Sequence, residues 1–180
     1  MNKLIKLKIL AIINITLLSF ITHFIYSIIP SPLTAILFPV NESIFEHMKI
    51  IYTTTLIYGM IDYLLLNKFN IKYNNFLLQL FLTSTIGIIL YLIIYIPIRI
   101  LLGEKLIISI LLLIIVYILM QLLSYYLLSI KEINIPNILI IILIMIIYIL
   151  FAYLTYNPPH NIFFYDTNTK IYGIKPLTKK

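Results

Sequence analysis

The chain has 180 residues and a net charge of +7; 62% of its residues are hydrophobic, only 11% are charged and none is cysteine. Soluble domains carry about 25% charged residues, so this composition excludes an ordinary soluble domain and indicates a membrane protein. The absence of cysteine excludes disulfides and thiolate-bound metals. The lysines gather at the two ends and in short loops, so we expect the lipid bilayer and its anionic headgroups as partners, and no nucleic acid.

Long uncharged intervals locate the membrane-spanning segments. Four such intervals, at 9–41, 73–98, 106–130 and 133–165, each exceed the ~20 residues that cross a bilayer as a helix. The sequence therefore predicts an all-α fold, a polytopic transmembrane helical bundle of about five spans. We expect the spans at 8–29, 44–66, 76–96, 105–128 and 137–156, followed by a C-terminal interfacial tail at 157–180.

The first predicted span follows Lys3, Lys6 and Lys8, a pattern that also begins secretory signal peptides. Its apolar run is longer than the core of a typical signal peptide, and no clean A-x-A cleavage site follows it. We therefore expect this segment to be retained as a helix of the bundle, with His23 near its end.

The second predicted span is unusual because it contains Glu46, His47, Lys49 and Asp62. Residues 50–60 are uncharged, so both polar groups lie near the ends of the span. At a rise of about 1.5 Å per residue, Glu46 lies only ~4–5 Å inside the start and Asp62 only ~6 Å from the other end. A charge at the bilayer centre costs about 2.5–3.5 kcal/mol, and at these depths the free-energy cost is much smaller.

The interiors of spans three to five are uncharged. Close contacts between helices are expected at small and hydroxyl residues, namely 53–55 of span two and 83–87 of span three. After span five, Asn157-Pro158-Pro159 ends the helix and redirects the chain. The aromatic residues at 163–165 favour a tail that docks on the bundle over a disordered basic tail.

Consecutive spans cross the membrane in opposite directions, so the end of span one, the start of span two and the end of span five share one face. This polar face is expected to collect most of the ionisable side chains: His23, Asn41, Glu42, Ser43, Glu46, His47, Lys49, Arg99, Glu104, His160 and Asp166. The lysines of the N-terminus and of the opposite loops predict a cell-membrane protein with a cytoplasmic N-terminus and an extracytoplasmic C-terminus. Lysines in the tail argue the other way, but most lie about 20 residues beyond the last span, where the charge rule weakens.

The stretch "FPVNESIFEHMKI" (38–50) opens span two and has several interpretations. Ser43 and Glu46 match a capping box, in which each side chain accepts a hydrogen bond from the other residue's backbone N–H. Glu46 and Lys49 can form an ion pair at i, i+3. The expected binding residues of the polar face are Asn41, Ser43, Lys49 and Asp166.

The three histidines suggest a metal site. His23, His47 and His160, with one of Glu42, Glu46 or Asp166, form a donor set that suits zinc or another divalent metal. The sequence contains neither HExxH nor HxxxH, so this hypothesis depends on convergence in the fold. Without a metal, His47 is a candidate catalytic general base oriented by Glu42 or Glu46, with Ser43 as nucleophile. A hydrogen-bonded structural histidine is the alternative.

"PVNESIFEHMK", the late histidine of span one and "NPPH…FYDTNTKIYGI" together resemble an uncharacterised domain-of-unknown-function family of small bacterial multi-pass membrane proteins with a PVNESxxEHxK motif. The resemblance covers most of the chain and implies that the two polar segments belong together. It implies no activity. A looser likeness to seven-span, metal-dependent hydrolases of the ceramidase kind is limited, because this chain has fewer spans and lacks their paired HxxxH.

Three functions are therefore open. The first is a binding or accessory role, in which the polar face holds a lipid, a small molecule or a partner. The second is a membrane-embedded hydrolase, with or without a metal, that acts on a lipid or another membrane substrate. The third is a small transporter or channel subunit, which the lack of charged residues in spans three to five disfavours.

Overall fold

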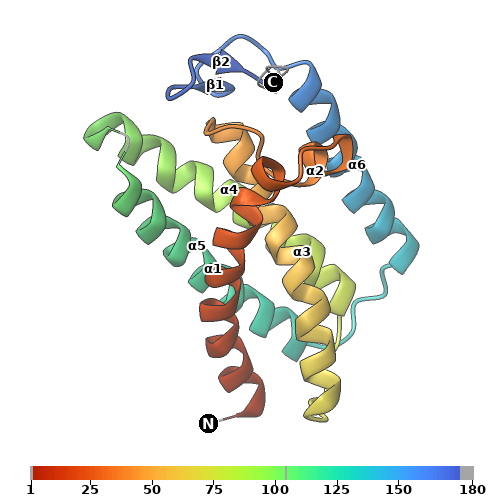
Figure 1. Ribbon diagram of the computed structural model, residues 1–180. Helices are drawn as coiled ribbons and strands as arrows, with labels where there is room; N and C mark the ends of the chain where they lie inside the picture. Colours follow the sequence, from red (N-terminus) through yellow and green to blue (C-terminus); the bar gives the residue numbers. More distant parts are fainter. Residues whose placement is uncertain (1, 104, 175–180) are drawn as a thin grey trace.

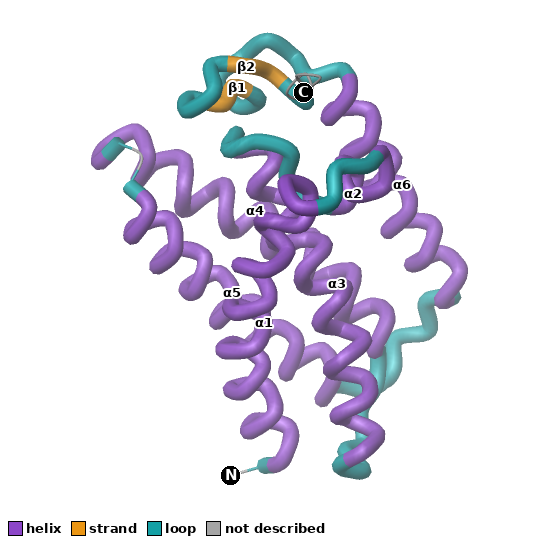
Figure 2. Tube along the Cα trace, in the orientation of Figure 1, coloured by secondary structure: helices purple, strands orange, loops and turns teal. Residues whose placement is uncertain are grey.

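The computed structural model describes residues 2–103 and 105–174, so the expectations for Glu104 and for residues 175–180 lie outside the described residues. Figure 1 labels the elements, and Figure 2 shows that helices make up most of the fold. The elements are α1 (Lys3–Ile28), α2 (Pro32–Leu37), α3 (Ile44–Lys68), α4 (Phe76–Leu102), α5 (Leu106–Ser129), α6 (Asn137–Tyr156), β1 (Tyr165–Asp166) and β2 (Ile171–Tyr172).

Within the described residues, five helices are long and apolar enough to cross a membrane, namely α1, α3, α4, α5 and α6. The predicted all-α bundle of about five spans is confirmed, and the chain is a multi-pass membrane protein. Three helices are longer than expected: α3 by two residues at its end, and α1 and α4 by more. Helix α1 begins at Lys3 because the Asn2 side chain accepts a hydrogen bond from the Leu4 N–H. The fourth element, α4, runs past Pro97 and ends before Gly103, whose φ of 71° favours glycine.

The short helix α2 was not expected, because the prolines around it suggested only a chain break. Ser31 caps it: the Ser31 Oγ accepts from the Thr34 N–H at 3.1 Å, and the Thr34 Oγ1 accepts from the Ser31 N–H at 2.9 Å. Pro32 occupies the first helical position, where its missing N–H has no consequence. Helix α2 packs against α1 and α6 and so carries the chain from span one to the polar face.

The core of the bundle lies between α1, α3, α4 and α5, while α6 packs against α2 and α4. The expected close contacts are present. The Thr22 and Thr54 hydroxyls lie 2.6 Å apart and join α1 to α3. A Cβ on Gly87 of α4 would come within 2.8 Å of the Met120 Cε of α5, so the glycine lets this side chain pack directly against the backbone of α4.

An ion pair between Lys8 of α1 and Asp62 of α3 lies at the end of the bundle opposite the polar face. Both residues are buried, with 4% and 3% of their surface exposed. The sequence places each residue near a membrane boundary, but the pair itself was not predicted. Consecutive spans run in opposite directions, so Lys8 and Asp62 lie at the same depth in the membrane. Opposite charges at matching depths on neighbouring spans could have identified this pair from the sequence.

Candidate functional site

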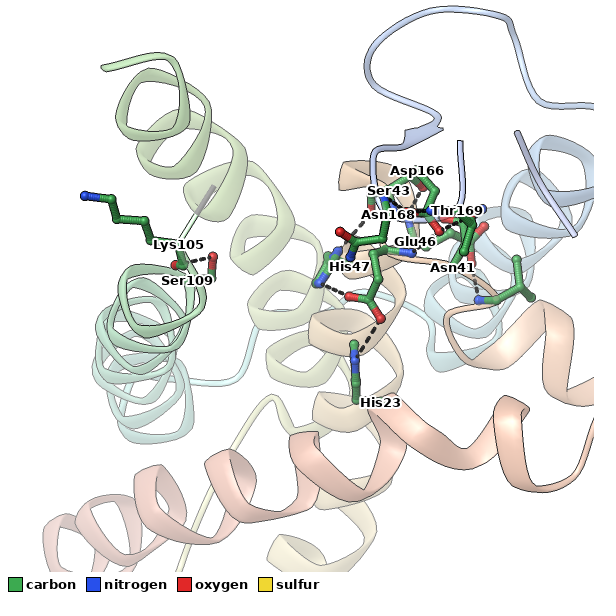
Figure 3. A network of polar contacts seen from close by, with 12 residues as sticks. His23, Asn41, Ser43, Glu46, His47, Lys105, Ser109, Asp166, Asn168 and Thr169 are labelled. Carbon is green, nitrogen blue, oxygen red and sulfur yellow. Dashed lines mark hydrogen bonds and ion pairs between the residues drawn. The ribbon is translucent and has the colours of Figure 1, made fainter. Parts of the chain in front are cut away.

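The polar face is formed by three segments that are distant in sequence. They are the end of α1, the loop at 38–43 together with the first turn of α3, and the tail at 157–174 that carries β1 and β2. Figure 1 shows the tail above this end of the bundle, and Figure 3 shows the polar side chains that converge there. The backbone confirms the contact, because the Phe45 N–H at the start of α3 donates to the Phe163 carbonyl of the tail at 3.1 Å.

At the centre of this face His23, Glu42 and His47 form a compact cluster; Figure 3 labels the two histidines. The Glu42 carboxylate bridges the two rings, with Oε1 at 3.2 Å from His23 Nε2 and Oε2 at 3.4 Å from His47 Nε2. The ring centroids lie 5.7 Å apart. One donor atom from each residue lies within 4.8 Å of the other two, and all three residues are half-buried.

The orientation of His47 is fixed by the main chain. Its Nδ1 lies 2.9 Å from the Ser43 carbonyl oxygen, and a carbonyl only accepts, so Nδ1 carries the hydrogen. In neutral His47 the Nε2 atom then presents a lone pair toward the Glu42 carboxylate. Two electron-rich atoms at 3.4 Å need a cation between them, either a proton or a metal ion. A histidine whose second nitrogen donates to a backbone carbonyl is the usual arrangement of a metal ligand.

Glu42 is the anionic member of the cluster. Hydrogen bonds from His23 and then from His47 hold the pKa of the Glu42 carboxyl well below its usual range, although partial burial opposes this effect. The carboxyl is therefore ionised at neutral pH, which is the state required of a carboxylate ligand.

The tail holds the loop that carries Glu42. The Asn41 amide donates to the Gly173 carbonyl at 2.8 Å, and the Glu42 N–H donates to the Asp166 carboxylate at 3.4 Å. The Asn41 side chain also accepts from the Ser43 N–H at 2.8 Å. Residues on both sides of Glu42 are thus tied to the tail or to each other, and this fixes the direction of its side chain.

Asp166 in turn organises the tail. Its Oδ1 accepts from the backbone N–H groups of Asn168 at 2.8 Å and Thr169 at 3.2 Å, and its Oδ2 accepts from the Thr169 hydroxyl at 2.6 Å. Asp166 is 1% exposed, so these bonds replace the water that a carboxylate otherwise needs. The turn between β1 and β2 is therefore built around one buried carboxylate.

A second polar network lies beneath the loop and joins α2, α3 and α6. Lys49 and Glu46 form the expected ion pair at 2.7 Å, and both side chains are almost fully buried. Lys49 also donates to the Ala35 carbonyl at 2.8 Å and to the Thr155 hydroxyl at 2.5 Å. Glu46 accepts from the Val40 N–H at 2.9 Å. These contacts link α3 to α2 and α6, so the network positions the three helices.

Two expectations need correction. The first concerns the capping box, of which only half forms: the Ser43 Oγ accepts from the Glu46 N–H at 3.4 Å, but the Glu46 carboxylate turns to Lys49 and Val40. The ion pair and the buried loop amide compete for this carboxylate, and Asn41 serves the Ser43 N–H in its place.

The second concerns His160, which does not join the other two histidines. Its ring stacks on Tyr172 at 4.5 Å between centroids, and it is not part of the metal-compatible group found among the described residues. Strand β2 turns back over the start of the tail and places Tyr172 against His160. This contact holds the His160 ring away from the cluster. Glu42 is the third member of the cluster.

Thr155 and Gly173 also contribute to the polar face. Thr155 was not predicted from the sequence, and Gly173 was part of the tail motif of the family resemblance but was not among the predicted site residues. Thr155 carries a hydroxyl near the end of a span that is otherwise almost entirely apolar. Its isolated polar side chain was the available sign of a role at the polar face. Gly173 has a φ of 64°, and a Cβ there would lie 2.9 Å from the Thr155 carbonyl oxygen. Glycine alone lets the tail approach α6 this closely.

The cluster has the donor set of a zinc site with an open coordination position, two imidazoles and a carboxylate. Zinc binds such atoms at about 2.0–2.2 Å, so in its tetrahedral geometry two ligands on one ion are about 3.3–3.6 Å apart. No two of the three donor atoms are more than 4.8 Å apart, so a small inward rotation of the side chains would bring them to one ion.

Comparison with known proteins identifies a family. A family model described as "Family of unknown function (DUF6512)" matches residues 1–174, which covers the membrane helices and the described tail. No curated protein and no solved structure matches the chain.

Proposed function

This chain belongs to the DUF6512 family of unknown function, and we propose that it is a cell-membrane protein that binds a divalent metal ion, such as zinc, at His23, Glu42 and His47. The proposed role is binding, with the metal and its ligand held at the polar face. The observation that carries the proposal is the mutual distance of the three donor atoms, all within 4.8 Å.

The surroundings of the cluster support the proposed metal site. The Ser43 carbonyl takes the Nδ1 hydrogen of His47, so Nε2 is directed at the shared carboxylate. The tail fixes the loop from which Glu42 reaches both rings. A site in which both the ligands and their supporting groups are held by packing is the arrangement that binds metals tightly.

The alternative function is a metal-dependent hydrolase that acts on a lipid or another membrane substrate. Three protein ligands with a vacant fourth position are typical of catalytic zinc, where the metal activates a bound water. Of the other predicted catalytic groups, Glu46 is engaged by Lys49, and the Ser43 hydroxyl caps α3. In the proposed site Glu42 and His47 are metal ligands and are not free to act as a general base, so we favour the binding role.

Metal analysis of the purified protein tests the proposal. After dialysis against trace zinc, we expect about one zinc ion per chain, as for a single three-ligand site. His23→Ala, His47→Ala and Glu42→Gln should each lose the bound zinc. His160→Ala is the matched control, because this histidine stacks on Tyr172 outside the cluster, and it should retain zinc. A wild-type protein free of zinc, or equal loss in all four variants, would refute the metal site.

A further inference from the structure

An apolar cavity of about 230 Å³ opens directly beside the cluster, with His23 and His47 in its wall. Helices α1, α3, α4 and α5 surround it, and Figure 3 shows Ser109 of α5 across from the two histidines. Its apolar lining consists mainly of Phe20, Phe24, Ile50, Leu106, Ile110 and Leu113.

The open side of this cavity faces the lipid. Phe20, Phe24 and Leu106 are 42%, 53% and 76% exposed and lie on membrane-spanning helices, whereas Ile50 at the back is 5% exposed. Exposed side chains on such helices contact acyl chains, so the cavity continues into the hydrocarbon of the bilayer. A molecule that enters from this side is itself a membrane component.

The charge of the metal-loaded site selects the head of that molecule. A divalent ion and the Glu42 carboxylate leave one net positive charge beside an apolar cavity, where an unpaired charge is unfavourable. A monocarboxylate neutralises it. A phosphate monoester, with about −1.5 to −2 charges at neutral pH, overcompensates and leaves the site negative.

The size of the cavity selects the tail. Pockets for drug-sized ligands have volumes of roughly 300–1,000 Å³, and this cavity lies below that range. It has room for part of one acyl chain, with the remainder in the bilayer, and excludes the two chains of a phospholipid side by side.

We propose that the cavity binds a long-chain fatty acid, with its carboxylate as the fourth ligand of the metal at His23, Glu42 and His47 and the first part of its chain between α1 and α5. This inference rests on the proposed metal site and adds the class of ligand. No covalent bond is made or broken; the carboxylate replaces water on the metal.

The first test uses the reciprocity of coupled binding. If palmitate coordinates the bound zinc, each ligand increases the protein's affinity for the other. Thermodynamic linkage requires the two increases to be the same factor. In nanodiscs of phosphatidylcholine, palmitate should tighten zinc binding by about fivefold or more, the lower range of coupled sites. Hexadecanol has a similar chain without the charge and should have no effect. Zinc binding that palmitate leaves unchanged would refute the fatty acid and keep the metal site; no zinc binding would refute both.

The second test places a reporter in the cavity. The chain contains no tryptophan, so Leu113→Trp introduces a single fluorophore in the lining, and Ile149→Trp serves as a lipid-facing control at a similar depth. With zinc present, dibromostearic acid should quench the Leu113→Trp variant saturably and at a lower mole fraction than the Ile149→Trp variant. Removal of zinc with EDTA, or His23→Ala, should abolish the difference. Equal, unsaturable quenching of both variants would mean that the fatty acid only partitions into the bilayer, and would overturn the proposal.

Discussion

Lys49 and Glu46 form an ion pair 2.7 Å long inside the protein, with 0% and 1% of their side chains exposed. The pair lies directly below the loop that carries Glu42, and it joins α3 to α2 and α6 through the Ala35 carbonyl and the Thr155 hydroxyl. The polar residues at the head of α3 therefore have two separate roles: Glu46 and Lys49 hold the scaffold, while Glu42 and His47 face the proposed ligand.

Removing one member of this pair should destabilise the protein strongly. Lys49→Met leaves the Glu46 carboxylate buried without a counter-charge, and the loss of one partner of a buried pair costs about 3–5 kcal/mol. The double variant Glu46→Gln with Lys49→Met leaves no unpaired charge and should recover much of that stability. Thermal unfolding of the detergent-solubilised protein gives the measurement. Additive losses in the double variant would contradict the coupling.

The approach of the tail to α6 should depend on Gly173. A side chain at its φ of 64° costs about 1–2 kcal/mol, and a Cβ would also collide with the Thr155 carbonyl oxygen and the Pro158 ring. We expect Gly173→Ala to detach the tail and to speed tryptic cleavage at Lys170. Gly103→Ala is the matched control, because its φ is 71° but nothing lies within 4 Å of the added Cβ. Equal cleavage rates in the two variants would argue against the close approach.

Asp166 should affect zinc binding without being a ligand. It accepts from the Glu42 N–H and organises the β1–β2 turn, so Asp166→Asn loosens the loop that carries the carboxylate ligand. Loss of a group that supports a ligand typically weakens metal affinity by about 10–100-fold. Asn168→Ala keeps its backbone donation to Asp166 and should bind zinc like the wild type. The dissociation constant for zinc, measured by competition with a chelating dye, decides between these outcomes.

The proposed orientation can be tested with single cysteines, because the chain has none of its own. Asn168→Cys lies in the tail at the polar face, and Lys72→Cys lies in the exposed loop between α3 and α4. With the N-terminus in the cytoplasm, a membrane-impermeant maleimide should label the Asn168→Cys variant in intact cells and the Lys72→Cys variant only after lysis. The reverse pattern would mean that the polar face is cytoplasmic.

Four of the five membrane helices could be predicted from the sequence because bilayer thickness imposes a length on their uncharged intervals. The other, α3, was recognised by its length and by its uncharged centre at residues 50–60. The short helix α2 could not be predicted in this way, since it is stabilised by local caps at Ser31 and Thr34 and by tertiary packing. Alternating span direction brought His23 and His47 to one face, and the structure sets them on either side of Glu42.

The exact partners at the polar face required three-dimensional information. The position of His160 depends on the path of the tail, which turns at Asp166 and brings Tyr172 under the ring. The direction of the Glu46 carboxylate depends on competition between the Ser43 N–H, the Val40 N–H and Lys49, and the contribution of Thr155 from α6 decides it. Neither outcome is encoded in local spacing.

The Lys8–Asp62 pair has a consequence for the synthesis of the protein. The two residues are 54 positions apart, so at about 5–20 residues per second the ribosome needs roughly 3–11 s after Lys8 to reach its partner. During that interval the first helix enters the bilayer with an uncompensated ammonium, which can reach the headgroups through its flexible chain. The arrival of α3 supplies the carboxylate of Asp62, and only then can this amine be buried between the two helices.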